Sequence, residues 1–286
     1  MYPGRLTRVR IITDSSADLE PKEYESLNIT CIPLTVFFGD AEYQENVNLS
    51  KDHFYDLLAG GEFPKTAQPS PQILLDLFEE AKQAGEEAIY FSISSAISGT
   101  YQTACATKEL AEYEGCYVFD SKNATGGLRV LLEQAVRLRD AGKSAKEIME
   151  GVAAIQDKIV LYACMDTLEY LYRGGRISQT VYKLGTLAQV KPIIRVTEEG
   201  AIEVPAKAMG MRKGMDMLCK RVEVQKPSPD HNFYAMYTGD RANGVALAEK
   251  FRAMGYDIPD EKIINVGAAI GSHVGPNACG MVYVAE

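Results

Sequence analysis

Hydrophobic residues in the first half of the chain occur alternately in short continuous runs and at helical spacing. The continuous runs predict buried strands over 9–13, 31–38, 88–93 and 116–119. Segments with one apolar face predict helices over 18–26, 51–59, 71–84, 101–113 and 127–140, and a further helix from Ser144. Alternating strands and helices indicate a parallel sheet covered on both faces. We therefore expect residues 1–157 to form a three-layer α/β domain.

The second half has a different order of predicted strands and helices. Strands are predicted over 158–165, 191–196, 201–208, 232–237, 262–268 and 281–284, with a hairpin turn at Glu198-Glu199-Gly200. Helices are predicted up to Tyr172 and over 178–188, 211–222 and 243–254. Mixed strands with helices on one side indicate a two-layer α/β domain over 158–286. The fold class is therefore α/β, with two α/β domains.

The charge balance restricts the class of partner. The chain has a formal net charge of −9, which argues against nucleic acid. Between Leu171 and Arg221, however, ten Lys and Arg residues face four acids, so that this stretch suits an anionic ligand, an acidic partner or a solvated helix face.

Cysteine usage and the N-terminal residues restrict the chemistry and the location. The six cysteines are scattered without ligand-like spacing, so neither a disulfide framework nor a zinc site is expected. The chain shows no signal peptide and no apolar run long enough to span a membrane, and we expect a cytoplasmic protein.

A turn rich in hydroxyl groups, from Ser94 to Tyr101, separates a predicted strand from a predicted helix. Backbone N–H groups and side-chain hydroxyls at such a turn converge near the positive end of the helix dipole, which favours an anion. The alternative is that Ser98 only caps its helix. Further polar segments follow other predicted strands, at Thr13–Asp18 and Asp120–Gly127, where ligands of open α/β sheets bind.

Three more segments have the composition of binding loops. Prolines fix the extended stretch Phe63–Pro71, which holds Thr66 and Gln68 or serves only as a rigid connector. Glycines surround His273 in 271–280, a ligand loop or a tight turn between the last two strands. In Arg173-Gly174-Gly175-Arg176, two arginines either grasp a carboxylate or phosphate or neutralise a helix end.

Taken together, these segments resemble the DegV family, the fatty-acid-binding proteins of bacterial fatty acid kinase. The resemblance spans the chain through seven motifs in order: TDSSADL, KTAQPSP, SSAISGTYQTA, DSKNATGGL, LYRGGRIS, KPII and GSHVGP. It implies two α/β domains and a long-chain fatty acid whose tail lies in an apolar tunnel, enclosed by the second domain. Carried over by position, Thr66 and Ser98 would bind the carboxylate with help from His273, near Arg173.

The helix start at Gly99 and Thr100 completes the expected donor set, because a buried carboxylate needs several converging donors. Apolar residues near the motifs are candidates for the tunnel wall: Leu168, Leu171, Ile177, Leu187 and Ile194. Each tail methylene removed from water contributes roughly 0.8 kcal/mol. No metal or cofactor is needed for such binding.

The resemblance also implies that a separate kinase subunit uses ATP to convert the bound acid to an acyl phosphate. The chain lacks a Walker A loop and a kinase-type glycine loop, so we expect the binding subunit, without catalytic residues of its own. We expect a monomer that contacts membranes only transiently. Three positions depart from the family pattern: Ala67 for serine, Asn277 for glycine, and Met209 where arginine is common, which bears on docking to the kinase.

Three rival functions remain open. A serine hydrolase would use Ser98 or Ser95 with His273, although the chain has no GxSxG elbow. A binder of another anion, such as an isoprenoid phosphate, would use Arg173 and Arg176. A DNA-binding regulator is disfavoured by the acidic balance.

Overall fold

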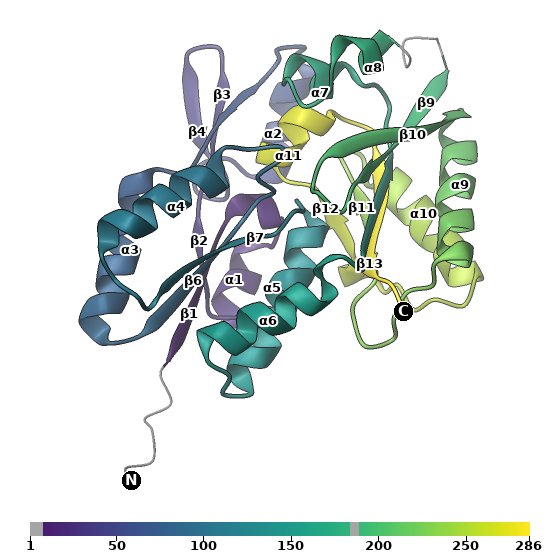
Figure 1. The fold of residues 1–286 in the computed structure, drawn as a ribbon. Helices are drawn as coiled ribbons and strands as arrows, with labels where there is room; N and C mark the ends of the chain where they lie inside the picture. The colour runs from purple at the N-terminus through teal and green to yellow at the C-terminus, as the bar shows by residue number, and fades with distance from the viewer. Residues whose placement is uncertain (1–7, 184–188) are drawn as a thin grey trace.

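The computed structural model describes residues 8–183 and 189–286, which contain three sheets (Figure 1). The first is parallel and has four strands in the order β2 (Ile29–Ile32), β1 (Val9–Asp14), β6 (Glu87–Ser92) and β7 (Cys116–Asp120). Helices α3 (Pro71–Ala84) and α4 (Thr100–Ala111) cover one face. Helices α1 (Pro21–Ser26), α5 (Gly126–Asp140) and α6 (Ala145–Gln156) cover the other. The predicted three layers around a parallel sheet are confirmed.

The second sheet has six strands and is mixed, as predicted. Its order is β10 (Ile202–Met209), β9 (Val190–Val196), β8 (Ile159–Cys164), β13 (Cys279–Val284), β11 (Tyr234–Tyr237) and β12 (Ile263–Asn265). Only β11 and β12 pair in parallel, and β9 with β10 forms the expected hairpin. Helices α9 (Met211–Val224) and α10 (Arg241–Ala253) pack on one face through a large apolar core.

Helix α5 lies between the two sheets and packs against both. Leu128 and Leu131 join the core of the parallel sheet, whereas Val130 packs against Leu161 and Val282 of the six-stranded sheet. This double packing explains why the start of α5 is buried on all sides instead of along one stripe.

The third sheet is a small antiparallel one that the sequence analysis missed. It has the order β4 (Ala41–Gln44), β3 (Thr35–Phe38) and β5 (Lys65–Ala67). We predicted one strand over 31–38, which was wrong: the chain leaves the parallel sheet after β2 and enters the small sheet at β3. Pro33 lies at the break and has no N–H with which to continue a ladder.

The segment that carries His273 also differs from prediction. The strand predicted over 262–268 ends at Asn265, and helix α11 (Ala268–Val274) places His273 on a helix instead of in a turn. Helix α2 (Lys51–Ala59), capped by Ser50, packs beside α11 against the small sheet.

Two short helices, α7 (Glu169–Arg173) and α8 (Gln179–Lys183), precede the six-stranded sheet's hairpin. The rest of the helix predicted over 178–188 lies outside the described residues. Among the described helices, none is both long and apolar enough to cross a membrane.

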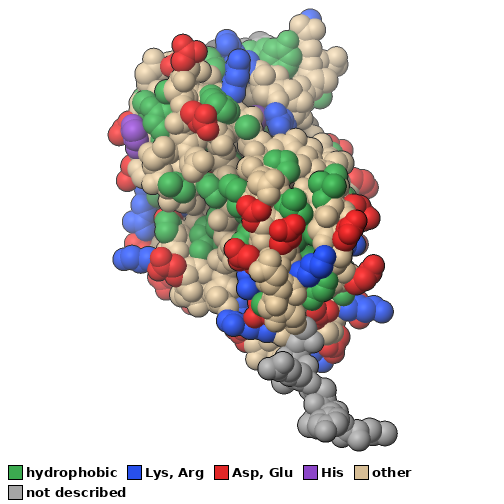
Figure 2. All heavy atoms as spheres, turned by 90° about the vertical axis from the view of Figure 1, so that its left-hand side faces the viewer, with side chains coloured by type: hydrophobic (Ala, Val, Ile, Leu, Met, Phe, Trp, Pro, Cys, Tyr) green, Lys and Arg blue, Asp and Glu red, His purple; other side chains and the backbone are tan. Residues whose placement is uncertain are grey.

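Figure 2 shows the face of the molecule on which α3 and α4 lie. Acidic and basic side chains are interspersed there, and hydrophobic side chains form small separate groups. This face therefore has the mixed surface of an ordinary globular protein.

Candidate ligand-binding site

A cavity of about 340 Å³ lies between the parallel and the six-stranded sheets. Its wall comes from β5, the turn before α4, the start of α5, strands β8 to β11, and helix α11. The six-stranded sheet contributes strand residues to the wall, whereas on the other side the wall comes from segments that follow the strands of the parallel sheet, such as Ile93 and the turn before α4. The segments that the sequence analysis selected, KTAQ, AISGTY, NATGG, RGGR and GSHVG, all reach it.

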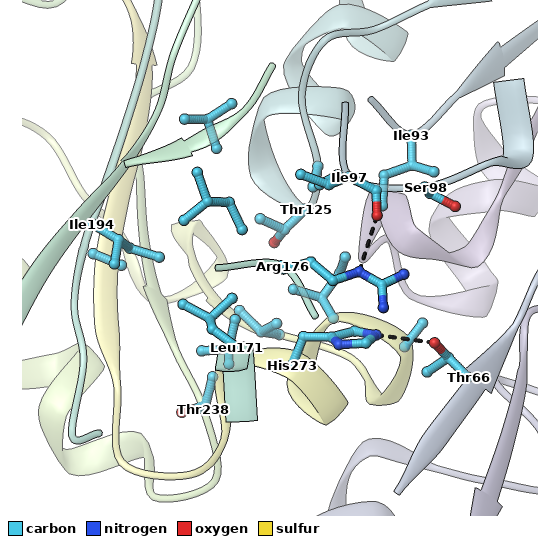
Figure 3. A pocket seen from close by; sticks show the side chains of 18 of the residues that line it. Thr66, Ile93, Ile97, Ser98, Thr125, Leu171, Arg176, Ile194, Thr238 and His273 are labelled. Carbon is cyan, nitrogen blue, oxygen red and sulfur yellow. Dashed lines mark hydrogen bonds between the residues drawn. The ribbon is translucent and has the colours of Figure 1, made fainter. Parts of the chain in front are cut away.

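Four polar side chains gather at one side of the cavity (Figure 3): Thr66, Ser98, Arg176 and His273. Strand β5 presents Thr66, whose Oγ1 lies 3.0 Å from Nε2 of His273 and is hydrogen-bonded to it. Which atom donates follows from the imidazole tautomer. The pairing of β5 with β3 thus brings together residues 207 positions apart in sequence.

The turn before α4 supplies hydroxyl groups and a helix start. Gly99 is the N-cap, and Ser98 Oγ lies 2.8 Å from Thr100 Oγ1 and accepts a hydrogen bond from the Thr100 amide at 3.3 Å. Ser98 therefore satisfies part of the helix start while its side chain lines the cavity. Gly99 and Thr100 line the cavity too, and the turn lies between a strand and a helix, as predicted.

The imidazole of His273 is largely buried, and its environment holds it neutral. Burial, and secondarily the charge of Arg176, lower the pKa of His273 to about 4. In the part of the chain that the structure describes, its Nδ1 has no hydrogen-bond partner. A Cβ on Gly174 would lie 2.2 Å from that nitrogen, so only glycine lets α7 approach the ring this closely.

Arg176 is the charged group of the cavity; the sequence analysis named it with Arg173 as a pair that either grasps an anion or neutralises a helix end, but not among the residues expected to bind the fatty acid. Its Nε donates to the Ile97 carbonyl at 3.0 Å and its Nη1 to the Gly174 carbonyl at 2.5 Å. Among the described residues, no carboxylate pairs with it, and burial lowers its pKa. The arrangement leaves a half-buried positive charge beside the hydroxyl groups and the imidazole.

Arg173, which we expected beside the site, is not among the residues that line the cavity. Its side chain is 54% exposed, pairs with Glu169 and stacks over the ring of Phe63 at 3.8 Å. The glycine pair between the two arginines turns the chain, with φ of +75° at Gly175, so that they point to different places.

The side of the cavity opposite the polar groups is apolar and belongs mainly to the six-stranded sheet. Leu161, Ile194, Ile202 and Met236 line it, together with three residues that carry hydroxyls, Thr125, Tyr237 and Thr238. Of the residues predicted for the tunnel wall, Leu171 and Ile194 line the cavity, whereas Leu168 and Ile177 pack with them in one core cluster without lining it. Leu187 lies outside the described residues.

The structure shows where the three residues that depart from the family pattern lie. Ala67 lines the cavity next to Thr66, where serine would add a hydroxyl. Asn277 adopts φ of +62°, a left-handed conformation that asparagine tolerates. Met209 ends β10 and is 57% exposed, away from the cavity wall.

Comparisons with known proteins agree over nearly the whole chain. A family model described as "Uncharacterised protein, DegV family" matches residues 8–286. A DegV domain-containing protein from Clostridium perfringens is 31% identical over 283 residues, which cover 96% of this chain and 97% of that protein.

Solved structures match equally well. A DegV family protein from Thermus thermophilus, described as binding fatty acid, is 28% identical, with a TM-score of 0.85 and coverage of 97% of this chain and 99% of that one. DegV from Bacillus subtilis, described as a fatty acid binding protein, is 25% identical, with a TM-score of 0.81 and coverage of 98% and 100%.

Proposed function

Because the chain belongs to the DegV family, we propose that it binds a long-chain fatty acid and presents it to a separate, ATP-dependent kinase subunit for acyl-phosphate formation. The observation that carries the binding part is the polarity of one cavity: hydroxyls, an imidazole and a guanidinium at one side, and aliphatic side chains at the other. Relatives of the same fold are described as binding fatty acids.

The polar side suits a carboxylate in particular. An ionised carboxylate leaves water at a high cost unless several donors meet it. Thr66, Ser98 and His273 supply neutral donors, with the helix start at Gly99 and Thr100, and Arg176 supplies the charge that the described residues leave unpaired. Strong hydrogen bonds to charged groups contribute about 1.5–3 kcal/mol each.

The apolar side suits an acyl tail. At about 0.8 kcal/mol for each methylene removed from water, a tail of about sixteen carbons would overcome the cost of immobilisation. Aliphatic residues of β8, β9, β10 and β11 would contact the tail without any directional bond, so chain length and shape would decide the preference.

The hydrogen bonds at the site favour binding over hydrolysis. A serine hydrolase needs a serine that is hydrogen-bonded to a histidine, and a third group that orients the histidine. Here the hydroxyl of Ser98 is hydrogen-bonded to Thr100, and the imidazole of His273 is hydrogen-bonded to Thr66.

The proposed handover to a kinase rests on the family resemblance and on Arg173, whose side chain is 54% exposed near the cavity.

Mass spectrometry of an organic extract tests the proposal directly. The protein is purified without any delipidating step, extracted and analysed, then reloaded with oleate or palmitate. We expect a near-stoichiometric long-chain fatty acid in the extract. A clean extract together with no uptake of either acid would overturn the proposed function, and a phosphorylated isoprenoid in the extract would replace it.

A further inference from the structure

Two buried carboxylates hold the first turn of α11, the helix that carries His273. The amide of Gly267, its N-cap, donates to Asp18 Oδ1 at 2.9 Å. The amide of Ala269 donates to Glu45 Oε1 at 3.1 Å. Both acids are about 1% exposed and come from the first fifth of the chain. The position of His273 therefore depends on acids that lie more than two hundred residues away in sequence.

The two carboxylates crowd one backbone position. A Cβ on Gly267 would lie 2.2 Å from Glu45 Oε1 and 2.7 Å from Asp18 Oδ1. Glu45 Oε2 accepts from the hydroxyl of Ser15 at 2.6 Å, whereas Asp18 Oδ2 is buried without a partner among the described residues. Ionising both carboxyl groups of a buried pair costs more free energy than ionising them in water. One of the two therefore keeps its proton to a higher pH than an exposed acid would.

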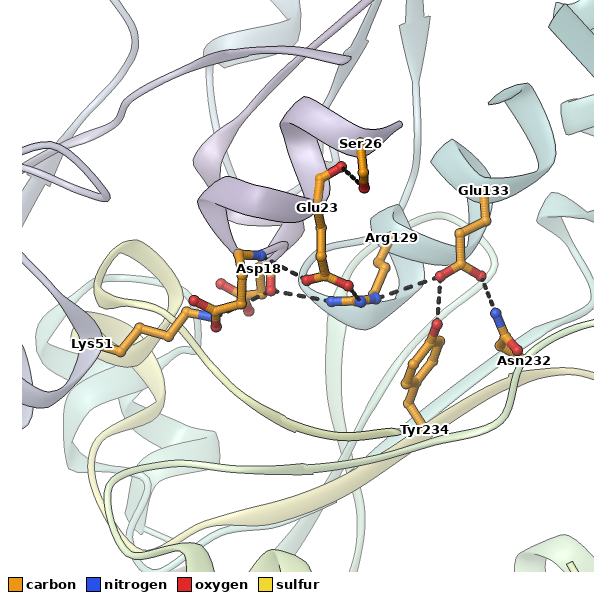
Figure 4. Close-up of polar contacts among 9 residues, drawn as sticks. Asp18, Glu23, Ser26, Lys51, Arg129, Glu133, Asn232 and Tyr234 are labelled. Carbon is orange, nitrogen blue, oxygen red and sulfur yellow. Dashed lines mark hydrogen bonds and ion pairs between the residues drawn. The ribbon is translucent and has the colours of Figure 1, made fainter. Parts of the chain in front are cut away.

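The nearby cations are engaged with other groups (Figure 4). Lys51 Nζ donates to the main-chain carbonyl of Asp18 at 3.2 Å and to Glu20 at 2.6 Å. Arg129 also reaches that carbonyl and forms ion pairs with Glu23 and Glu133. The other titratable groups that interact with the charges of the pair are Tyr24, Cys31 and Tyr55. The carboxylates of Asp18 and Glu45 thus lack a direct ion pair among the described residues.

We propose that Asp18 and Glu45 are positioning residues of the ligand site: a proton held by the pair fixes the start of α11 and keeps His273 against Thr66, and its loss loosens α11 and weakens headgroup binding. The inference rests on the proposed fatty-acid-binding function. Burial raises the pKa of Asp18 to about 6, and burial with the charge of Asp18 raises the pKa of Glu45 to about 7. The packed arrangement is the one that binds the proton more tightly, so deprotonation disfavours it.

Binding of hexadecanesulfonate, followed by calorimetry, tests the proposal because this headgroup stays ionised throughout. For the wild type we expect the dissociation constant to rise roughly threefold to tenfold between about pH 5.5 and about pH 8, equivalent to half to one pKa unit of coupling. Glu45→Gln, which keeps an acceptor for Ala269, should lose this slope. Glu20→Gln, a change in the same cluster that does not touch α11, should keep it.

Each outcome decides a different claim. An equal slope in Glu45→Gln would assign the pH dependence to His273 itself and overturn the positioning role. If the wild type binds neither hexadecanesulfonate nor palmitate at any pH, the proposed function is overturned instead. If Glu45→Gln fails to fold, NMR of the ligand-free wild type decides: we expect the His273 ring resonances to shift with a midpoint near pH 6–7, well above the pKa of about 4 of the imidazole. No such shift would overturn the proposal.

Discussion

At the scale of single residues, the cavity combines donors of three kinds around one point. Thr66 and Ser98 offer hydroxyls, His273 a neutral imidazole, and Arg176 a permanent charge. The hydroxyls and the imidazole are hydrogen-bonded within the site, so a ligand carboxylate would replace or share bonds that already exist. Each donor should therefore contribute a modest part of the affinity, and the loss of any one should leave the fold intact.

Alanine substitutions at the two hydroxyl positions test this assignment. Thr66→Ala and Ser98→Ala should each weaken binding of a long-chain fatty acid by about 1–3 kcal/mol, the cost of removing one partner from a buried charged group. Titration calorimetry on delipidated protein measures the change. Ser95→Ala is the matched control, because Ser95 lies in the same turn but does not line the cavity. Unchanged affinity in both test variants would remove the carboxylate assignment.

The pKa of His273 should respond to the ligand. In the ligand-free protein, burial and Arg176 hold it at about 4, so the ring is neutral near pH 7. An anionic headgroup beside the ring favours the protonated form, and we expect the pKa to rise on binding. NMR titration of the three histidines with and without oleate gives the answer, with His53, whose side chain is exposed on α2, as an internal reference. A pKa that stays at about 4 would place the headgroup away from the ring.

At the scale of elements, the helix starts that are specified by a few neighbouring residues were predicted correctly. Helix α3 begins at Pro71 as its Ser-Pro start predicts, and the capping box at Ser144 and Glu147 begins α6. The small sheet was missed, because β3 and β5 are short and are specified by pairing with each other across 26 intervening residues. The start of α11 was missed because its amides are satisfied by Asp18 and Glu45, partners that no local pattern reveals.

For the candidate site too, the sequence predicted what its motifs specify and missed what depends on contacts between distant segments. Motif resemblance identified Thr66, Ser98 and His273, which the fold brings to one cavity. It did not separate Arg173 from Arg176, since both flank the same glycine pair and α7 has only five residues. The direction in which Arg176 points depends on the φ of +75° at Gly175 and on its contact with the carbonyl of Ile97, a distant partner that the motif does not reveal.

The glycine pair after α7 gives a matched test of this geometry. Gly174→Ala would place a methyl 2.2 Å from His273 Nδ1, so the ring must move and fatty acid affinity should fall, with global stability little changed. Gly175→Ala meets no neighbouring atom but requires φ of +75°, which should cost about 1–2 kcal/mol of stability without weakening binding. Urea unfolding and calorimetry on both variants separate the effects. Equal affinity in the two variants would contradict the close contact.

At the scale of the whole molecule, acids buried between segments of the N-terminal and C-terminal halves link stability to pH. Asp18 and Glu45 have raised pKa values, so the folded protein binds protons more tightly there than the unfolded chain does. Stability from these groups is therefore greatest below their ordinary pKa values, about 4, and falls as the pH rises from there through about 6 to 7.

This sign gives a prediction for Glu45→Gln. Removal of one buried acid should flatten the dependence and raise the free energy of unfolding at about pH 8 by about 1–3 kcal/mol. Urea unfolding at about pH 5.5 and about pH 8 measures the difference. Glu20→Gln, whose side chain is 57% exposed, should follow the wild type. A parallel profile for Glu45→Gln and the wild type would show that the pair does not set the pH dependence.

For the proposed handover, a kinase subunit would have to contact the surface of the molecule near the cavity. Arg173 is exposed near the cavity, held by Glu169 and by the ring of Phe63, and does not line the cavity. Charge reversal there removes a basic group that an acidic kinase surface would meet and leaves the carboxylate donors in place. We expect Arg173→Glu to reduce acyl-phosphate formation with a bacterial fatty acid kinase subunit and ATP by about tenfold, with fatty acid affinity within about twofold of the wild type. Arg241→Glu, an exposed reversal on α10, is the control and should affect neither. Equal loss of both activities in Arg173→Glu would place the arginine in ligand binding, and loss of neither would remove it from the handover.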